Sequence, residues 1–269
     1  MQLDLTGNVA VVAGAAQGIG HAIASAFAAE GASVALLDRD PAVTAAAADL
    51  ASRHAVATLP LVADVTDHGR MRQAAAEVLA AFGRIDHVVF AVGVGSGGFG
   101  FPFWNVAPEE WPRVLHVNVI GAVNVAHAFA PPLVQARAGT MLFLASVAGQ
   151  IGSQTDPPYS ASKAALINFA QCAARDLAEY GVRVNSLCPG MVKTALNRAV
   201  WEGWARRQTP DAWRSYEEWA DEKVRRVVPL GRWQTPEDVA NMAVFLASPR
   251  AHNVTGQTIN VDGGFVMHW

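Results

Sequence analysis

The sequence contains little cysteine and little charge for its length. Only Cys172 and Cys188 occur among 269 residues. Neither lies in a metal-binding or redox spacing, so a cytoplasmic, reducing environment is expected. Charged residues make up 16% of the chain and hydrophobic residues 52%, a composition that excludes disorder. The formal net charge of −3, with no basic run, argues against a nucleic-acid partner.

Other missing features exclude further classes of protein. The apolar runs are interrupted by His116, Asn118, Asn124 and His127 before they reach the ~20 residues of a membrane span, so no membrane partner is expected. No signal peptide is recognisable at the start. The histidines show neither an H-E-x-x-H pattern nor cysteine-paired spacing, so we expect no metal site. A G-x-S-x-G nucleophile elbow and a P-loop lysine are also absent.

The sequence does contain a regular alternation of short β-rich runs and longer alanine-rich runs. The strands expected from it are 9–14, 33–38, 56–65, 85–93, 140–147, 182–190 and 258–260, and the expected helices are 18–31, 41–54, 67–83, 108–134, 159–180 and 236–248. Several of these strands are apolar at consecutive positions, which is typical of a parallel sheet buried on both faces.

This alternation predicts a fold of the α/β class. Repeated strand–helix–strand crossovers give a single-domain, Rossmann-like, doubly wound parallel sheet of about seven strands with helices on both faces. No linker or composition break divides residues 1–269. Only residues 195–229 depart from the alternation, and we expect them to form a helical insertion.

Individual residues mark several of the expected boundaries. Pro41 suits the first turn of a helix because its φ angle is already fixed. Asp67 is a candidate N-cap, and Gly31 and Gly83 are candidate helix ends. Pro60 lies near the centre of the third strand and weakens the expectation of a strand there.

The segment "AGAAQGIG" (13–20) lies between the first strand and the first helix. Its glycines, Gly14, Gly18 and Gly20, would let the backbone approach a ligand closely. The helix that follows presents free N–H groups and the positive end of its dipole, which suit a pyrophosphate. A lone glycine pattern also fits an ordinary turn, but this position in the fold favours a dinucleotide.

Asp38 closes the second strand about 20 residues after these glycines, where a dinucleotide fold places an acid on the ribose hydroxyls. The same carboxylate would repel a 2′-phosphate, at a cost of about 4 kcal/mol for two like charges ~4 Å apart. NAD is therefore favoured over NADP as the cofactor. Arg39 tempers this preference because an arginine can accept that phosphate.

Tyr159 and Lys163 are four residues apart and share one face of a helix. A tyrosine with an ordinary pKa of ~10 is a poor base, whereas a nearby ammonium favours the phenolate. The pair could equally be a routine surface contact. Two other residues favour chemistry: Ser146 ends the preceding strand, where open α/β sheets place their sites, and Asn118 is an amide in an apolar stretch.

Seven motifs in this order resemble those of the short-chain dehydrogenase/reductase family over essentially the whole chain. They are "AGAAQGIG" (13–20), "ADV" (63–65), "HVNVIG" (116–121), "LASVAG" (144–149), "YSASK" (159–163), "NSLCPGMVKT" (185–194) and "VDGG" (261–264). The resemblance implies that Tyr159 is the general acid/base and that Ser146 holds the substrate oxygen. It implies that Lys163 lowers the pKa of Tyr159 and binds the nicotinamide ribose, and that Asn118 holds a water linked to Lys163.

The same resemblance implies the cofactor contacts and the assembly. The residues expected to bind the dinucleotide, besides Tyr159 and Lys163, are Gly14, Gln17, Gly18, Ile19, Gly20, Asp38, Arg39, Asp64, Val65, Gly93, Pro189, Val192 and Thr194. Among them, Asp64 and Val65 would contact adenine, and Val192 and Thr194 the carboxamide. A homo-oligomer, a tetramer or a dimer, is also implied.

The chain departs from the family pattern at two places. Ala13 stands where the family has threonine, and "FAVG" (90–93) stands where it has Asn-Asn-Ala-Gly. In the family the threonine hydroxyl ties the phosphate turn to that second motif. We expect packing of Ala13 against Ala91 to replace the tie.

Two segments are candidate substrate walls. One is the aromatic, glycine-rich loop 93–104. The other is the insertion 195–229 with the residues after it to 233, which resembles a substrate lid and holds five of the eight tryptophans: Trp201, Trp204, Trp213, Trp219 and Trp233. Its arginines, Arg198, Arg206, Arg207 and Arg214, could bind a carboxylate or sulfonate or could form a solvated helix face. Trp269 at the end could pack at a subunit interface or fray.

The sequence thus predicts an NAD(H)-dependent oxidoreductase that interconverts a secondary alcohol and a ketone on a small-molecule substrate, such as a sugar, polyol or small hydroxy compound. One alternative is an NADPH-dependent ketone or 3-oxoacyl reductase, or a dehydrogenase of an anionic substrate. A non-catalytic dinucleotide sensor on the same fold is another. A methyltransferase would not need the Tyr159–Lys163 pair.

Overall fold

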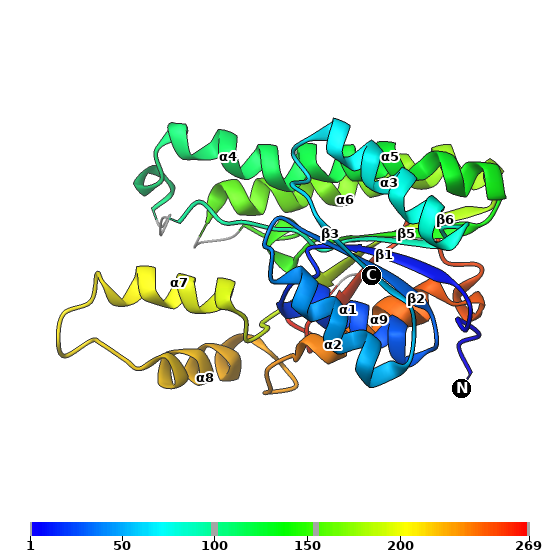
Figure 1. Cartoon of the computed structure of the whole chain (residues 1–269). Coiled ribbons are helices and arrows are strands. Elements are labelled where there is room, and N and C mark those ends of the chain that lie inside the picture. Colours follow the sequence, from blue (N-terminus) through cyan, green and yellow to red (C-terminus); the bar gives the residue numbers. More distant parts are fainter. Residues whose placement is uncertain (1, 98–101, 153–155, 268–269) are drawn as a thin grey trace.

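Seven parallel strands form one sheet in the computed structural model, which describes residues 2–97, 102–152 and 156–267 (Figure 1). The strand order is β3-β2-β1-β4-β5-β6-β7. The strands are β1 Val9–Ala13, β2 Ser33–Asp38, β3 Thr58–Val62, β4 His87–Phe90, β5 Gly139–Leu144, β6 Val182–Pro189 and β7 Thr258–Val261. The predicted single-domain, Rossmann-like sheet is confirmed.

Helices cover both faces of this sheet, as Figure 1 shows. The α-helices of the described residues are α1 Gly18–Ala29, α2 Val43–His54, α3 His68–Phe82, α4 Trp111–Leu115, α5 Gly121–Ala136, α6 Pro157–Leu177, α7 Ala195–Ala205, α8 Tyr216–Val227 and α9 Pro236–Ala247. Helices α3, α5 and α6 lie on one face and α1, α2 and α9 on the other. The sheet is therefore buried between two helical layers.

The two layers have separate apolar cores. Alternate residues of β1 point to opposite faces, so Val11 and Ala13 belong to the core under α3, α5 and α6, whereas Ala10 and Val12 belong to the core with α1 and α9. A strand between two such cores must be apolar at consecutive positions, which explains the pattern in the sequence.

The strand order reverses at β1, where β2 lies on one side and β4 on the other. Ala13 is paired with Leu37 of β2 and with Phe90 of β4. Chain segments that leave these strands diverge toward opposite faces, and open α/β sheets bind ligands in the crevice so formed, at the carboxyl ends of the strands.

Most of the expected element boundaries are close to those observed. Asp67 accepts a hydrogen bond from the Arg70 N–H and caps α3, and Gly83 ends it with a φ of 76°.

Helix α2 begins at Val43 rather than at Pro41, because the Asp40 side chain instead accepts the Ala42 N–H in a preceding turn. Pro60 lies in β3, an edge strand, where a missing N–H is tolerated.

The helix expected over 108–134 is divided. A short turn, Pro108–Glu110, leads into α4, and a π-helical turn, His116–Ile120, separates α4 from α5. Among the described residues, only the stretch 108–136 is long and apolar enough to cross a membrane, and 44% of its most apolar window is buried within the protein. Val125 and Phe129 of α5 pack in the core against the sheet.

Helices α7 and α8 form a hairpin that projects from the sheet at one end of the molecule (Figure 1). An aromatic cluster joins them: the ring of Trp201 lies 5.9 Å from that of Tyr216 and 6.4 Å from that of Trp213. Trp204 and Trp219 are 6.1 Å apart in the same cluster. The expected helical insertion is therefore a two-helix hairpin held together largely by its tryptophans.

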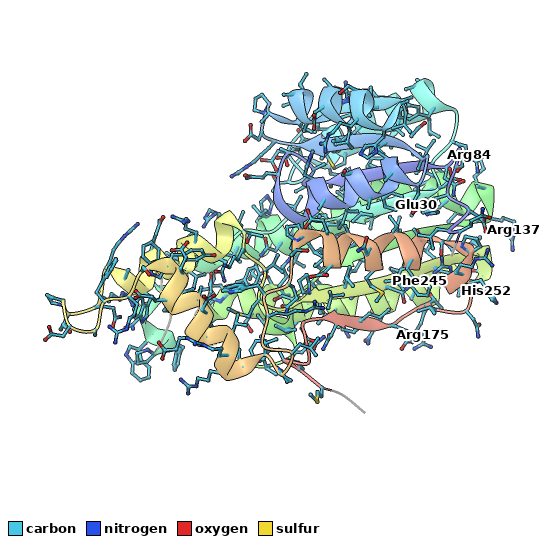
Figure 2. The ribbon with its side chains drawn as sticks, turned by 90° about the horizontal axis from the view of Figure 1, so that it is seen from below. Glu30, Arg84, Arg137, Arg175, Phe245 and His252 are labelled. Carbon is cyan, nitrogen blue, oxygen red and sulfur yellow. The ribbon has the colours of Figure 1, made fainter. Side chains whose placement is uncertain are left out.

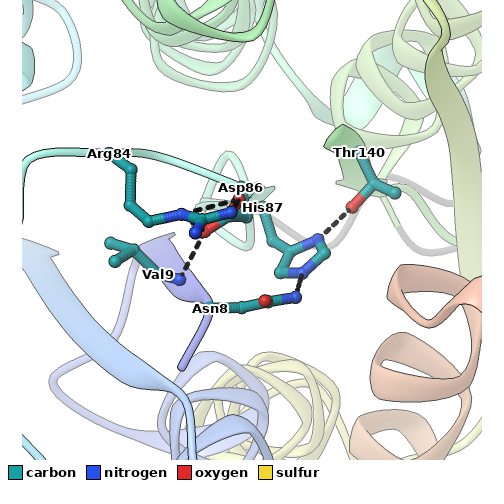
Figure 3. Close-up of polar contacts among 6 residues, drawn as sticks. All are labelled: Asn8, Val9, Arg84, Asp86, His87 and Thr140. Carbon is teal, nitrogen blue, oxygen red and sulfur yellow. Dashed lines mark hydrogen bonds and ion pairs between the residues drawn. The ribbon is translucent and has the colours of Figure 1, made fainter. Parts of the chain in front are cut away.

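A buried polar cluster joins β1, β4 and β5 at their amino ends, the end of the sheet near which Figure 2 labels Arg84 and Arg137. One ring nitrogen of His87 lies 2.9 Å from the Asn8 amide and the other lies 2.9 Å from the Thr140 hydroxyl (Figure 3). Burial lowers the pKa of His87 to about 4. The folded protein therefore holds this imidazole neutral.

We expect His87 to weaken the fold in acid. Its pKa is depressed from 6.5 to about 4 on folding, so its contribution to stability is present above about pH 6.5 and is lost as the pH falls toward 4. The loss is about 2 kcal/mol between about pH 7 and pH 5. Denaturant unfolding at both pH values should show that His87→Gln removes this difference and that the exposed His252→Gln does not; equal pH dependence in all three proteins would contradict the assignment.

Candidate active site

A cavity of about 740 Å³ lies at the carboxyl ends of the strands and continues to the α7–α8 hairpin. This volume suits a ligand of the size of a cofactor or drug. Of the residues that sequence analysis assigned to catalysis or to the dinucleotide, all except Asn118 line it: Gly14, Gln17, Gly18, Ile19, Gly20, Asp38, Arg39, Asp64, Val65, Gly93, Ser146, Tyr159, Lys163, Pro189, Val192 and Thr194.

The glycine turn between β1 and α1 forms one wall of the cavity. A Cβ on Gly20 would lie 2.0 Å from the Gly14 carbonyl oxygen, so the helix and the turn can approach this closely only with glycine. Gly18 has a φ of 61° and faces open space. Gln17, the N-cap of α1, makes no side-chain capping bond, so the first N–H groups of the helix suit an anionic ligand. The turn therefore fits a dinucleotide pyrophosphate.

Asp38 is fixed at the end of β2 by two backbone groups. One carboxylate oxygen accepts the Ala16 N–H at 3.0 Å, and the other accepts the Asp40 N–H at 3.0 Å. This places its negative charge beside Arg39 at one end of the cavity. Asp64 lies there too, with a pKa lowered mainly by the hydrogen bond from the Thr66 N–H.

Tyr159 lies in the first turn of α6. This helix begins at Pro157, two residues earlier than expected, and its N-cap Asp156 accepts the Tyr159 N–H. Burial raises the pKa of Tyr159 to about 12, and its hydrogen bond with Ser146 opposes the shift. Ser146 follows β5 and also accepts the Ala148 N–H at 3.1 Å. The two hydroxyls thus meet at the cavity wall.

Lys163 is directed toward β5 rather than at the Tyr159 hydroxyl. Its ammonium donates to the Leu144 carbonyl at 2.8 Å and lies 5.5 Å from the centre of the Tyr159 ring. Burial lowers the pKa of Lys163 to about 8. Burial is the largest influence on the Tyr159 pKa and raises it, and the lowering of this pKa by Lys163 stays a prediction. Gly93 allows the close approach: a Cβ there would lie 3.2 Å from the ammonium.

Asn118 lies in the π-helical turn, fully buried, outside the cavity lining. Its amide donates to the Val94 carbonyl and to the Ser162 hydroxyl, and its oxygen accepts the Val94 N–H. Ser162 in turn donates to the Tyr159 carbonyl at 2.7 Å. In this structure Asn118 positions the loop after β4 and the start of α6, and the water-holding role stays a prediction.

The expected packing of Ala13 against Ala91 is wrong. Ala13 pairs with Phe90, so the next residue of that chain, Ala91, points to the other face. The two side chains belong to different apolar cores. The segments are tied instead by the backbone, since the Ala91 N–H donates to the Ala13 carbonyl at 2.9 Å.

The α7–α8 hairpin supplies lining residues that sequence analysis missed. Asn197 and Val200 come from α7, and Lys223 and Val227 from α8. None of the four predicted arginines lines the cavity: Arg198 stacks over Tyr216, Arg206 approaches Glu202, and Arg214 donates to backbone carbonyls. A helical wheel of the isolated sequence could have placed Lys223 and Val227 on one face, but not toward the cavity.

The aromatic loop contributes less than expected to the part of the cavity that the structure describes. Phe103 and Trp104 are 68% and 70% exposed, contact each other, and do not line the cavity. Residues 98–101 and Trp269 lie outside the described residues. Within the described ranges, no three His, Cys, Asp or Glu side chains are grouped as metal ligands.

Known proteins resemble this chain over nearly its whole length. A family model described as enoyl-(acyl carrier protein) reductase matches residues 14–266. The 3-oxoacyl-[acyl-carrier-protein] reductase of Thermotoga maritima is 32% identical over 265 residues, which cover 98% of this chain and 100% of the relative.

Solved structures resemble it equally well. L-sorbose reductase from Gluconobacter frateurii, complexed with NADPH and L-sorbose, has a TM-score of 0.90 at 28% identity and full coverage of both chains. NAD⁺-bound xylitol dehydrogenase has a TM-score of 0.89 at 29% identity, covering 97% of this chain and 100% of its own. The fold and the cavity are those of an oxidoreductase built on a Rossmann-like sheet. The chain belongs to the short-chain dehydrogenase/reductase family.

Proposed function

We propose that the protein is an NAD-dependent dehydrogenase that interconverts a secondary alcohol and a ketone on a small hydroxy compound such as a sugar or polyol. One observation carries the proposal. Ser146, Tyr159 and Lys163 meet on the wall of the same cavity whose other end holds the glycine turn and Asp38. A proton-transfer group and a dinucleotide site are thus parts of one cavity.

The side chains of the cavity support a division of roles. The Ser146 hydroxyl, held by the Ala148 N–H, would bind the substrate oxygen. Tyr159 would remove the carbinol proton during oxidation and return it during reduction. Lys163, fixed by the Leu144 carbonyl, has further donors that can reach a ribose hydroxyl. When bound, the nicotinamide supplies the hydride acceptor or donor.

The preference for NAD rests on Asp38. Its carboxylate is held in place by two backbone N–H groups, so it cannot easily turn away from a 2′-phosphate. Solved relatives include both a NADPH complex and an NAD⁺ complex, so family membership alone leaves the choice open. An NADPH-dependent 3-oxoacyl reductase is the second candidate, favoured by the Thermotoga relative.

We expect Asp38→Asn to shift the cofactor preference toward NADP. The variant removes the charge that repels a 2′-phosphate and leaves Arg39 to bind it, so the ratio of kcat/KM for NAD to that for NADP should fall about tenfold or more. Asp40→Asn is the matched control, because Asp40 is exposed outside the cavity lining and its loss should leave the ratio unchanged. A wild-type protein that prefers NADP would contradict the assignment.

The function itself is tested with a panel of polyols, sugars, hydroxy acids and 3-oxoacyl thioesters, each with both cofactors. We expect turnover of hydroxy compounds with NAD. Tight NADH binding without turnover of any compound would favour a dinucleotide sensor, and selective reduction of the thioesters with NADPH would favour the second candidate.

A further inference from the structure

The cavity extends beyond Ser146 and Tyr159 to a part walled by the hairpin. Asn197 and Val200 line it from α7, and Lys223 and Val227 from α8. The aliphatic side chains cannot bind a charged group, so the polar character of this part depends on Asn197 and Lys223. The Asn197 amide oxygen already accepts the Tyr216 hydroxyl at 3.0 Å.

Lys223 is a partly buried cation without an anionic partner among the described residues. Its ammonium lies 4.9 Å from the centre of the Trp219 ring, and the ion pairs and hydrogen bonds of the described chain do not include it. Burial lowers its pKa, which agrees with an ammonium that has lost water.

The other cations of the hairpin are placed differently. Arg198 and Arg206 approach glutamates at the surface, and Arg226 is exposed. On α8, the residues one turn from Lys223 are Trp219 and Val227, so no carboxylate shares its face at i±4. Lys223 is therefore a hairpin cation that lines the cavity and is available to a ligand.

The negative charges of the cavity are at its other end. The acidic side chains that line it are Asp38 and Asp64, both at the carboxyl ends of β2 and β3, where the sequence predicts the adenosine half of a dinucleotide. The cavity is thus polarised, with unpaired positive charge where the substrate would lie. A partly desolvated ammonium binds a carboxylate or phosphate oxygen more strongly than a neutral hydroxyl.

We infer that Lys223 is a specificity-determining residue that binds an anionic oxygen group of the substrate, so that the preferred substrates are hydroxy or keto compounds carrying a carboxylate or a phosphate. The inference rests on the proposed function for the position of the reacting carbinol at Tyr159. It narrows the proposed substrate class to those sugars, polyols and other small hydroxy compounds that carry an acidic group. The Trp219 ring, 4.9 Å from the ammonium, makes a cation–π contact with it.

The first test compares sorbitol, gluconate and sorbitol 6-phosphate as substrates of the wild type, Lys223→Met, Lys223→Arg and the exposed control Arg226→Met. We expect Lys223→Met to raise KM for the preferred anionic compound about tenfold to a hundredfold, with KM for sorbitol unchanged. The KM values of Lys223→Arg and Arg226→Met should stay near those of the wild type. The compound preferred by the wild type identifies the anion as carboxylate or phosphate. A wild type that prefers sorbitol, or an equal rise of KM for all three compounds in Lys223→Met, would overturn the inference.

A second measurement does not need turnover. Acetic anhydride labels free amines, and peptide mass spectrometry gives the rate at each lysine. In the NADH-saturated protein, gluconate or the phosphate should slow labelling of Lys223 and sorbitol should not. Lys193, which stacks over Trp233 outside the cavity lining, is the internal control. If no compound is oxidised, the proposed function fails while labelling still decides the role of Lys223: no protection, or equal protection of both lysines, would contradict it.

Discussion

Tyr159→Phe is expected to lower kcat by about a thousandfold while the protein keeps its fold and its affinity for dinucleotide. The substitution removes one hydroxyl, the one that meets Ser146 at the cavity wall, and general acid–base groups contribute about 10²–10⁴-fold to rate. The ring that faces Lys163 stays in place. Steady-state kinetics with the best compound of the substrate panel measures the loss.

Two controls separate proton transfer from a change in packing. Tyr180→Phe removes a hydroxyl from a tyrosine that lies outside the cavity lining, beneath the Arg137 guanidinium, and should leave kcat unchanged. An NADH fluorescence titration of Tyr159→Phe should give a dissociation constant close to that of the wild type. Retention of full turnover by Tyr159→Phe would remove this residue from the mechanism.

Gly20→Ala is expected to destabilise the protein strongly, although alanine is the better helix former. Intrinsic propensity favours alanine by about 1 kcal/mol, but its Cβ would lie 2.0 Å from the Gly14 carbonyl oxygen and 2.8 Å from the carbonyl carbon. Both atoms are backbone, so α1 must move away from the glycine turn. Overpacking of this kind costs about 3 kcal/mol, which corresponds to a fall in Tm of roughly 6–12 °C in a chain of this size.

The displaced turn should also bind the dinucleotide more weakly, so the affinity for NADH is expected to fall tenfold or more. Gly152→Ala is the matched control: Gly152 lines the same cavity, but a Cβ there meets nothing within 4 Å. Thermal unfolding and NADH titration of the two variants make the comparison. An unchanged Tm in Gly20→Ala would show that the close contact between turn and helix is not required.

The sheet could be predicted from the sequence because its signals are local. Consecutive apolar residues mark strands buried on both faces, and the glycine turn followed by Asp38 marks the point where the strand order reverses. Capping residues such as Asp67 and Gly83 act within a few positions of themselves. By contrast, the other residues at the cavity wall were named only through the resemblance to the family: Asp64, Val65, Gly93, Pro189, Val192 and Thr194.

The remaining features depend on how distant elements meet. The spacing of Tyr159 and Lys163 predicts a shared helix face, but not that the ammonium donates to Leu144 of β5. The sequence suggested that Ala13 and Ala91 pack together, but the register of β1 and β4 places their side chains on opposite faces of the sheet. Which cation of the hairpin lines the cavity likewise depends on how α8 lies over it. The periodicity of the sequence does not predict that orientation.

The most direct test of this account is the fate of the hydrogen on the carbinol carbon. The protein is incubated with NAD⁺ and a substrate from the panel that carries deuterium at that carbon, and the reduced cofactor is analysed by mass spectrometry. A dehydrogenase should transfer one deuterium to NADH for each molecule of ketone formed, and Tyr159→Phe should slow this transfer. Binding of NADH without transfer of label from any hydroxy compound would contradict the assignment of the protein as a dehydrogenase.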